Sequence, residues 1–394
     1  DRSPSRGLGD VYKRQIQIEK VAGNAGGNYC ADVSQWVIGW ILGIEWPTEF
    51  VIGTNESHPE MTSFQGTYAQ AENASPFEVF LAETAETAVS YEMKKYAQQR
   101  PVALSNWATT DPLEHPNEPN PDMEDAVSID TEHITATNAF EAGFFASYHI
   151  YPYYPDFLSY DTKYLSNENQ NPYLAYLTEL NAHHAVPVII SEYGIPTSRG
   201  IAHKNAVTHM SQGYATEEQQ AQWIISMNKD LQASGCAGGF IFSWQDEWFK
   251  RTWNTADYEN PERRPYWMNV ESPEECFGLL AFEPGKKDAL VKVDGDDSEW
   301  RKKDLITEND GIRVYAKLDS AYLYLLVKGD TFDFEKDTLY LPLGILSGQG
   351  NTQYNGTTFD DGADFLLRLH GKKDSAVLVD AYYDLFQYLS LIHI

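Results

Sequence analysis

Several features that would restrict the class of this protein are scarce in its 394 residues. Its three cysteines, Cys30, Cys236 and Cys276, are odd in number and widely spaced, so they indicate neither a disulfide framework nor a metal site. No apolar run approaches the length of a membrane span. No GxGxxG or Walker-type glycine loop occurs, which disfavours nucleotide binding and gives no sign of a cofactor.

Basic residues are also scarce, with 29 Lys and Arg against 58 Asp and Glu, for a formal net charge of −29. Nucleic-acid binding needs clustered cations that release counterions from phosphates, so this balance argues against it. A neutral or cationic partner fits better, although a merely solvated acidic surface would give the same count. The oligomeric state cannot be read from the sequence.

Apolar residues make up 42% of the chain and aromatic residues 13%, which is typical of a globular protein rich in Tyr and Trp. The length fits two domains, a barrel of roughly 250 residues and a second module of roughly 100. We expect the first to cover residues 16–285 and the second residues 286–388.

The two ends have a different character. Residues 1–15 are basic where the rest is acidic, and together with residues 389–394 they look like translated sequencing-adapter read-through. We expect both segments to be artefacts and leave them out of the fold. A secretion signal would be lost with a natural N-terminus, and we expect a secreted or cell-surface protein.

Three helices are predicted by their capping residues. Ser75-Pro76 with Glu78 forms a capping box that begins a helix reaching about Gln99. Asn171-Pro172 begins a second helix that ends near His184. Thr216 with Gln219 begins a third, which ends near Ser234 before Gly235.

Short apolar runs lie between these helices and predict buried parallel strands. They are Val37–Ile44, Val102–Ser105, Phe144–Ile150, Val188–Ile190 and Gly239–Phe242. Each run ends in polar or aromatic residues, which is where barrels and doubly wound sheets both place their sites. Without a nucleotide-binding loop, the (β/α)8 barrel is the better prediction.

Two of these strand ends carry a glutamate, Glu45 in WILGIEW and Glu192 in VIISEYG. These segments resemble the acid/base strand and the nucleophile strand of the clan A glycoside hydrolases, where the acid/base follows strand four and the nucleophile follows strand seven. The resemblance covers roughly residues 37–250. It implies a retaining glycosidase that needs no cofactor, with Glu45 protonated and Glu192 ionised when substrate binds.

The same resemblance implies a set of sugar contacts around the two glutamates. His149 and Tyr151 would follow strand six and contact the nucleophile or the sugar, and Trp244 would follow strand eight as the floor of the sugar subsite. The remaining predicted substrate contacts are Trp46, Asn106, Trp107, Asp246 and Glu247. For Asp246 and Glu247, pairing with Lys250 or Arg251 is an equally good interpretation. The Tyr- and Pro-rich stretch 148–155 predicts a loop over the strand ends.

One residue departs from the clan pattern, because Ile44 stands where an Asn usually precedes the acid/base. An Asn-Glu pair, Asn117-Glu118, lies in a Pro-rich loop with no strand before it and is the weaker alternative. Because of Ile44, a second function remains open, in which the barrel binds carbohydrate or serves surface interactions without cleaving a glycosidic bond. A transglycosylase, which shares the covalent intermediate, also remains open. A strand-end Glu can be a plain ion-pair partner as well.

Few residues precede Val37, so we expect strands one to three of the barrel to be largely missing. After about Lys286 the pattern changes to β-rich runs, Ile312–Leu318, Tyr322–Val327 and Ala376–Tyr382. These predict an antiparallel β-sandwich. The Asp294-Gly295 motif followed by Trp300 resembles a carbohydrate-binding module, and a purely structural sandwich is the alternative.

Overall fold

The computed structural model describes residues 16–18, 27–29, 33–165, 170–198, 200–247, 250, 252–253, 272–281, 290–319, 322–344 and 350–379. Its contacts divide the chain into two units, Asp1–Trp244 and Gln245–Ile394. The predicted boundary at residue 286 and both expected adapter segments lie outside the described residues, and the observed division comes earlier in the chain. No helix in the described ranges is both long enough and apolar enough to cross a bilayer.

The first unit is built on a five-stranded parallel sheet in the order β12-β9-β8-β6-β3. Its strands are β3 (Trp40–Leu42), β6 (Val102–Trp107), β8 (Ala146–His149), β9 (Val188–Tyr193) and β12 (Gly238–Ile241). All five strands predicted from the apolar runs are confirmed. The order never reverses, unlike the doubly wound sheet, in which the chain returns past its first strand. Closure into an eight-stranded barrel stays a prediction.

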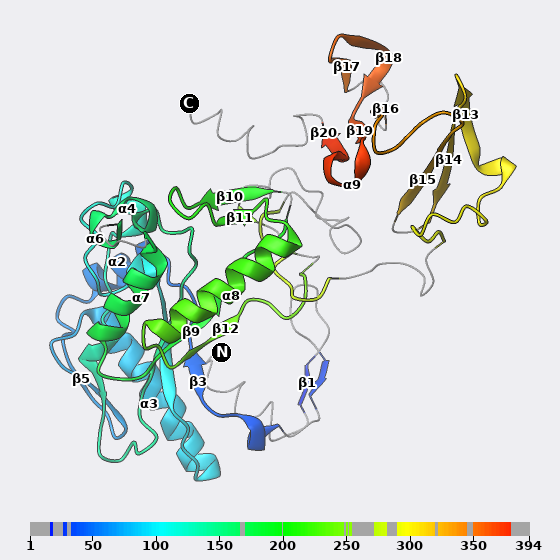
Figure 1. The fold of residues 1–394 in the computed structure, drawn as a ribbon. Helices are drawn as coiled ribbons and strands as arrows, with labels where there is room; N and C mark the ends of the chain where they lie inside the picture. The colour runs from blue at the N-terminus through cyan, green and yellow to red at the C-terminus, as the bar shows by residue number, and fades with distance from the viewer. Residues whose placement is uncertain are drawn as a thin grey trace. The chain divides into compact units, whose positions relative to one another are not determined.

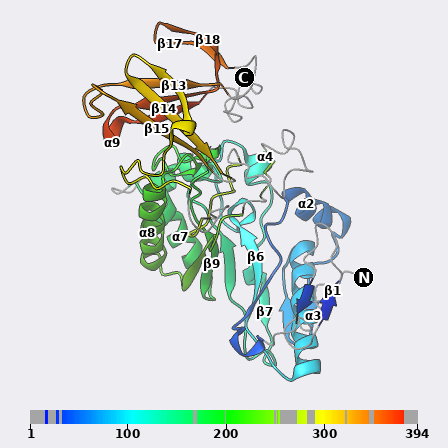
Figure 2. The same ribbon diagram turned by 90° about the vertical axis from the view of Figure 1, so that its right-hand side faces the viewer.

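Three long helices follow strands of this sheet, and their predicted starts are confirmed. They are α3 (Pro76–Tyr96), α7 (Pro172–His183) and α8 (Glu217–Ala233). Ser75 and Thr216 each form the expected capping box, and the Asn171 side chain accepts from Leu174 N. Figures 1 and 2 show α7 and α8 beside β9 and α3 close to β6.

Shorter elements fill the connections of the first unit. They are the strands β1 (Ile16–Ile18), β2 (Gly27–Tyr29), β4 (Phe64–Gln65), β5 (Ala69–Ala71), β7 (Ile134–Ala136), β10 (Ile201–Lys204) and β11 (Ser211–Gly213), with the helices α2 (Thr48–Ser57), α4 (Pro121–Glu124), α5 (Phe157–Tyr160) and α6 (Thr162–Leu165). The stretch after β8 is a loop, as predicted, with turns and an isolated bridge between Tyr151 and Tyr154.

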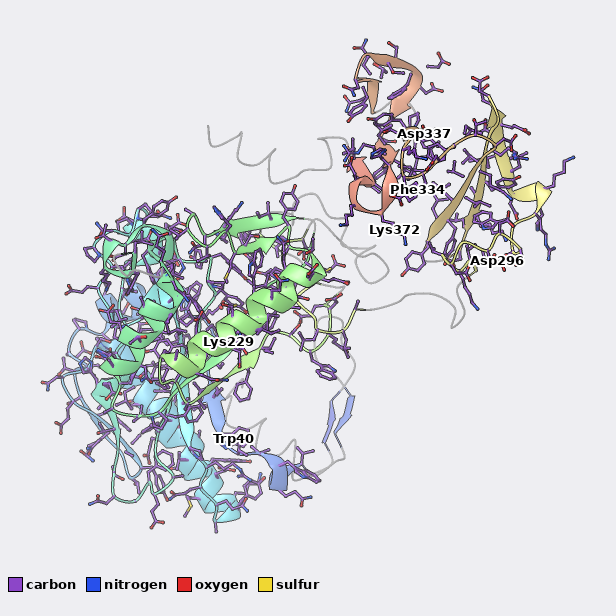
Figure 3. All side chains as sticks on the ribbon, in the orientation of Figure 1. Trp40, Lys229, Asp296, Phe334, Asp337 and Lys372 are labelled. Carbon is purple, nitrogen blue, oxygen red and sulfur yellow. The ribbon has the colours of Figure 1, made fainter. Side chains whose placement is uncertain are left out.

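Two hydrophobic clusters pack the helices against the sheet. One packs α7 and α8 against β8 and β9 through residues such as Tyr176, Ile190 and Met227. The other packs α3 against β6 through residues such as Phe77 and Leu104. The opposite faces of the helices are exposed to solvent, and Lys229 of α8 lies on one of them (Figure 3). Trp40 of β3 adds a polar contact to the helical side, because its indole N–H donates to Glu92 of α3 at 3.0 Å. The sheet is therefore anchored on its helical side.

The second unit is antiparallel, as predicted. One sheet is the meander β13 (Leu305–Asn309), β14 (Ile312–Leu318) and β15 (Leu323–Gly329); the other joins β16 (Leu339–Leu343), β19 (Phe365–Leu369) and β20 (Ala376–Val379). A hairpin, β17 (Asn351–Tyr354) and β18 (Thr357–Ala363), and a short helix, α9 (Gly371–Asp374), complete it. Packing of the two sheets into a sandwich stays a prediction.

Candidate active site

Glu45 lies three residues beyond the end of β3, at the carboxyl edge of the parallel sheet. Its position depends on Gly43, whose φ of +94° places it in the left-handed region. A Cβ at Gly43 would stand 2.1 Å from the Trp46 ring, so glycine is needed for that ring to fold back beneath the turn. The Glu45 side chain keeps 37% of its surface exposed, which leaves it open to a ligand.

Glu192 is the penultimate residue of its strand, β9, and reaches the same edge of the sheet. Its neighbour in the register is His149, the last residue of β8. Parallel neighbours in register point to the same face, so His149 and Glu192 face each other across adjacent strands. The Glu192 side chain is 26% exposed.

His149 links the two glutamates. Its Nδ1 lies 3.1 Å from Glu45 Oε1 and 3.4 Å from Glu192 Oε2, and only 8% of its side chain is exposed. One oxygen of each glutamate and one His149 ring nitrogen all lie within 4.8 Å of one another. Residues from β3, β8 and β9, far apart in the sequence, thus meet at one point.

Tyr151 supplies a second contact to Glu192. Its hydroxyl donates to Glu192 Oε2 at 2.9 Å. Burial, reinforced by the charge of Glu192, raises the pKa of Tyr151 well above its ordinary value. Tyr151 therefore keeps its proton at physiological pH and can stabilise the ionised form of Glu192.

Two tryptophans predicted as sugar contacts connect Glu45 to the sheet. Trp46 donates through Nε1 to the Ser105 carbonyl at 2.8 Å and packs edge-on against Phe77. Trp107 donates through Nε1 to the Trp46 carbonyl at 3.1 Å and shares its register with His149. These bonds position the residue after Glu45. Sugar contact by either half-buried ring stays a prediction.

The prediction that Asn106 contacts substrate is wrong. Its side chain is fully buried, and its amide donates to the carbonyls of Thr110 and Ile129 at 3.2 and 3.0 Å. Its carbonyl oxygen accepts from the Trp107 N–H and the Thr110 hydroxyl. Asn106 therefore orders the turn after β6 from the inside.

The remaining predicted contacts fall at or beyond the end of the first unit. Trp244, its last residue, is 70% exposed, as a sugar-stacking ring would be. Asp246 and Glu247 belong to the second unit and have partners there. Asp246 accepts from Gly278 N at 2.8 Å, and Glu247 pairs with Lys250 at 3.1 Å, the alternative that the sequence left open.

Glu118, the weaker alternative for the acid, is not at this site. It is 6% exposed and accepts from the backbone N–H groups of Asn120 and Phe157, both at 2.7 Å. With Glu124 and Asp156 it forms a carboxylate cluster whose oxygens lie within 4.8 Å of one another. No periodic pattern in the sequence predicts this cluster, because Glu118 lies in a loop and the other two lie at the ends of the one-turn helices α4 and α5.

Burial is the main cause of the perturbed acidity in this carboxylate cluster. It raises the pKa of Glu124 to about 7, with a smaller contribution from the charge of Asp156. The pKa values of Glu118 and Asp156 are raised as well, also through burial. Near neutral pH the cluster therefore carries less negative charge in the folded chain than three fully ionised carboxylates would.

Glu45, His149 and Glu192 also form a set of donors that a divalent cation could use, with two carboxylate oxygens and one imidazole nitrogen. The same geometry suits proton transfer and nucleophilic attack without metal, because two carboxylates at short range flank an open edge of the sheet.

No family model and no curated protein sequence matches the chain. Among solved structures, the chain is similar to the endo-β-1,4-mannanase from Thermotoga petrophila, with 14% identity and a TM-score of 0.32. The match covers 67% of this chain and 44% of the mannanase chain. This likeness is too low to assign a family.

Proposed function

We propose that this protein is a retaining glycosidase that acts on a β-linked glycan or glycoside. The observation that carries the proposal is the short distance between the Glu45 and Glu192 oxygens, within 4.8 Å. Retaining glycosidases hold their carboxyl groups about 5 Å apart, whereas inverting enzymes leave roughly 6.5–9.5 Å for a water molecule.

The contacts of each glutamate support the role proposed for it. Glu192 accepts from the neutral Tyr151 hydroxyl and faces His149, which stabilises its ionised form and suits a nucleophile. Glu45 contacts His149 and has the more exposed side chain, which suits a general acid that then acts as general base.

The reaction takes two steps. The Glu45 proton moves to the glycosidic oxygen while Glu192 attacks the anomeric carbon, which releases the leaving group and forms a glycosyl ester on Glu192. Glu45, now ionised, takes a proton from water, whose oxygen attacks the anomeric carbon and frees Glu192. Two displacements at one carbon retain its configuration.

The test uses the full chain with 4-nitrophenyl β-glycosides of glucose, mannose, galactose and xylose. Glu192→Ala should lose turnover, and azide should restore it with an inverted glycosyl azide as product. Glu45→Ala should keep the first step on these activated substrates, and azide, which needs no general base, should accelerate the second step and give a retained glycosyl azide. Glu49→Gln, an exposed carboxylate of α2, is the matched control and should behave as wild type. Unchanged activity of Glu192→Ala would reject the assignment.

A second candidate, a carbohydrate-binding protein that does not cleave, is favoured by Ile44. This residue precedes Glu45 and is 61% exposed, and it offers no hydrogen bond to a sugar hydroxyl. Binding of a glycan by the wild-type chain without any product, equal in strength to binding by Glu192→Ala, would favour this function over the first.

A further inference from the structure

Three aromatic side chains lie next to one another in the first unit, and Trp107, at one end, is bonded to the residue that follows Glu45. The rings of Trp107 and Tyr154 have centroids 6.1 Å apart, and those of Tyr154 and His203 are 4.7 Å apart. They come from the end of β6, the loop after β8, and β10. Figure 1 shows β10, β11 and α4 at the same end of the first unit. We call Trp107, Tyr154 and His203 the aromatic row.

The row begins beside the proposed acid. Trp107 Nε1 is bonded to the carbonyl of Trp46, the residue after Glu45, and Trp107 stands in register with His149. A general acid contacts the glycosidic oxygen, so the leaving part of the substrate extends past it. A row that starts next to Glu45 is therefore placed to meet the leaving sugar chain.

The support under the row is rigid. Asn205, fully buried just after β10, donates to the Pro152 and Leu158 carbonyls at 2.9 and 3.2 Å. Ala206 N donates to the Ser159 hydroxyl at 3.1 Å. These bonds join the hairpin that carries His203 to the loop that carries Tyr154. The rings are thus held in place before a ligand arrives, which lowers the entropic cost of binding.

The rings of Tyr154 and His203 are uncharged over a wide pH range. Burial lowers the pKa of His203 to about 4, and burial together with the charge of Glu124 raises the pKa of Tyr154 to about 12. Neutral, half-buried rings suit the C–H faces of an uncharged sugar, whereas a protonated imidazole would favour an anion.

We propose that the aromatic row binds the sugar units on the leaving-group side of the cleaved bond, so that the preferred substrate is a neutral oligosaccharide or polysaccharide and not a simple glycoside. This inference rests on the proposed glycosidase function and adds a substrate class to it. It assigns substrate-binding roles to Tyr154 and His203, and it gives Trp107 a defined subsite.

The test compares the β-glycosyl fluoride with the unmodified β-linked oligosaccharide of the same sugar. The fluoride has neither a sugar nor a ring on the leaving side, so Tyr154→Ala and His203→Ala should leave its hydrolysis within about twofold. The same variants should lower kcat/KM for the oligosaccharide roughly tenfold, chiefly through a higher KM, because one ring contact is lost. Tyr154→Phe keeps the ring and should retain most of the activity.

Tyr160→Ala is the matched control, because Tyr160 is a 51% exposed tyrosine on the neighbouring α5. It should leave both substrates unaffected. Equal losses on both substrates for Tyr154→Ala would mean that the ring only supports the fold, and no loss on the oligosaccharide would mean that the row is not a subsite. Either result overturns the inference.

Failure of the proposed function gives a different pattern. If the wild-type chain cleaves neither substrate, calorimetric binding of the oligosaccharide replaces kinetics. Binding that Tyr154→Ala weakens tenfold and Tyr160→Ala does not would support the row while rejecting hydrolysis. Binding that is the same in all variants, or undetectable in the wild type, would overturn the row too.

Discussion

The hydroxyl of Tyr151 directly stabilises the ionised form of Glu192. It donates to Glu192 Oε2 at 2.9 Å and is itself held neutral by burial. A hydrogen bond to a charged acceptor contributes about 1.5–3 kcal/mol, more than most neutral ones. The nucleophile should therefore lose much of its stabilisation when this oxygen is removed.

We expect Tyr151→Phe to lower kcat about tenfold or more and to move the acidic limb of the kcat/KM profile to higher pH. The direction follows because loss of the donor favours the protonated, inactive form of Glu192. A profile from pH 3.5 to 9 on a 4-nitrophenyl glycoside measures both effects. A proportional loss at every pH, with no movement of the limb, would assign Tyr151 a packing role only.

Sequence reasoning located Glu45 and Glu192 because parallel strands bring their carboxyl ends to one edge, whatever the separation along the chain. It misassigned Asn106 for a physical reason. A polar side chain at a strand end can turn toward substrate or back into the following turn, and the carbonyls of Thr110 and Ile129 that hold it were not visible in the pattern.

At the scale of elements, α4 and α5 are tied together by buried carboxylates. Glu124, at the end of α4, accepts from Asp156 N at 2.8 Å, just before α5 begins. Its pKa is raised to about 7 from 4.5, so between these two values the folded chain binds a proton that the unfolded chain does not. The free energy of unfolding must therefore fall as the pH rises from about 4.5 to about 7.

We expect Glu124→Gln to remove part of this fall and to stabilise the chain at pH 8 by about 1–3 kcal/mol, since Gln still accepts from Asp156 N without carrying charge. Urea unfolding at pH 4.5 and pH 8 measures the difference. Asp122→Asn, an exposed change in the same helix, should give no such gain. Equal stability of Glu124→Gln and wild type at pH 8 would contradict the expectation.

The three long helices α3, α7 and α8 were predicted well, whereas the carboxylate cluster and the β10–β11 hairpin were not, for one reason. A capping box is a local arrangement, complete within four residues, and Ser75 and Thr216 form theirs as the sequence requires. The carboxylate cluster and the β10–β11 hairpin depend on long-range partners such as Asp156 and Pro152. No short window of sequence contains both halves of those contacts.

At the scale of the whole molecule, strong net charge coexists with exposed apolar side chains at both edges of the parallel sheet. Ile38 and Ile44 flank β3 and are 82% and 61% exposed, while Phe240 of β12 is 53% exposed and Trp244 follows it. Self-repulsion from a formal charge of −29 opposes contact between such surfaces. Salt shortens its range from about 10 Å at 0.1 M to about 3 Å at 1 M.

We expect the chain to bind a hydrophobic dye in its native state and to associate more strongly as salt rises from 0.05 to 1 M, because screening removes the repulsion while apolar contact persists. Light scattering measures the association. Ile38→Gln should reduce it at an unchanged net charge, whereas Val293→Gln, at a 98% exposed isolated side chain, should not. Association that weakens with salt would point instead to ion pairing between copies.

The order of the strands along the chain would allow the site to be divided between two fragments. Glu45 enters on β3, whereas His149, Tyr151 and Glu192 all follow the exposed turn at Asn138 and Ala139. A backbone break in that turn would place the proposed acid, Glu45, on one fragment and the proposed nucleophile, Glu192, on the other, together with His149 and Tyr151. Under the proposed mechanism neither fragment is active alone. Any turnover would therefore measure the reassembly of the two fragments into the native fold.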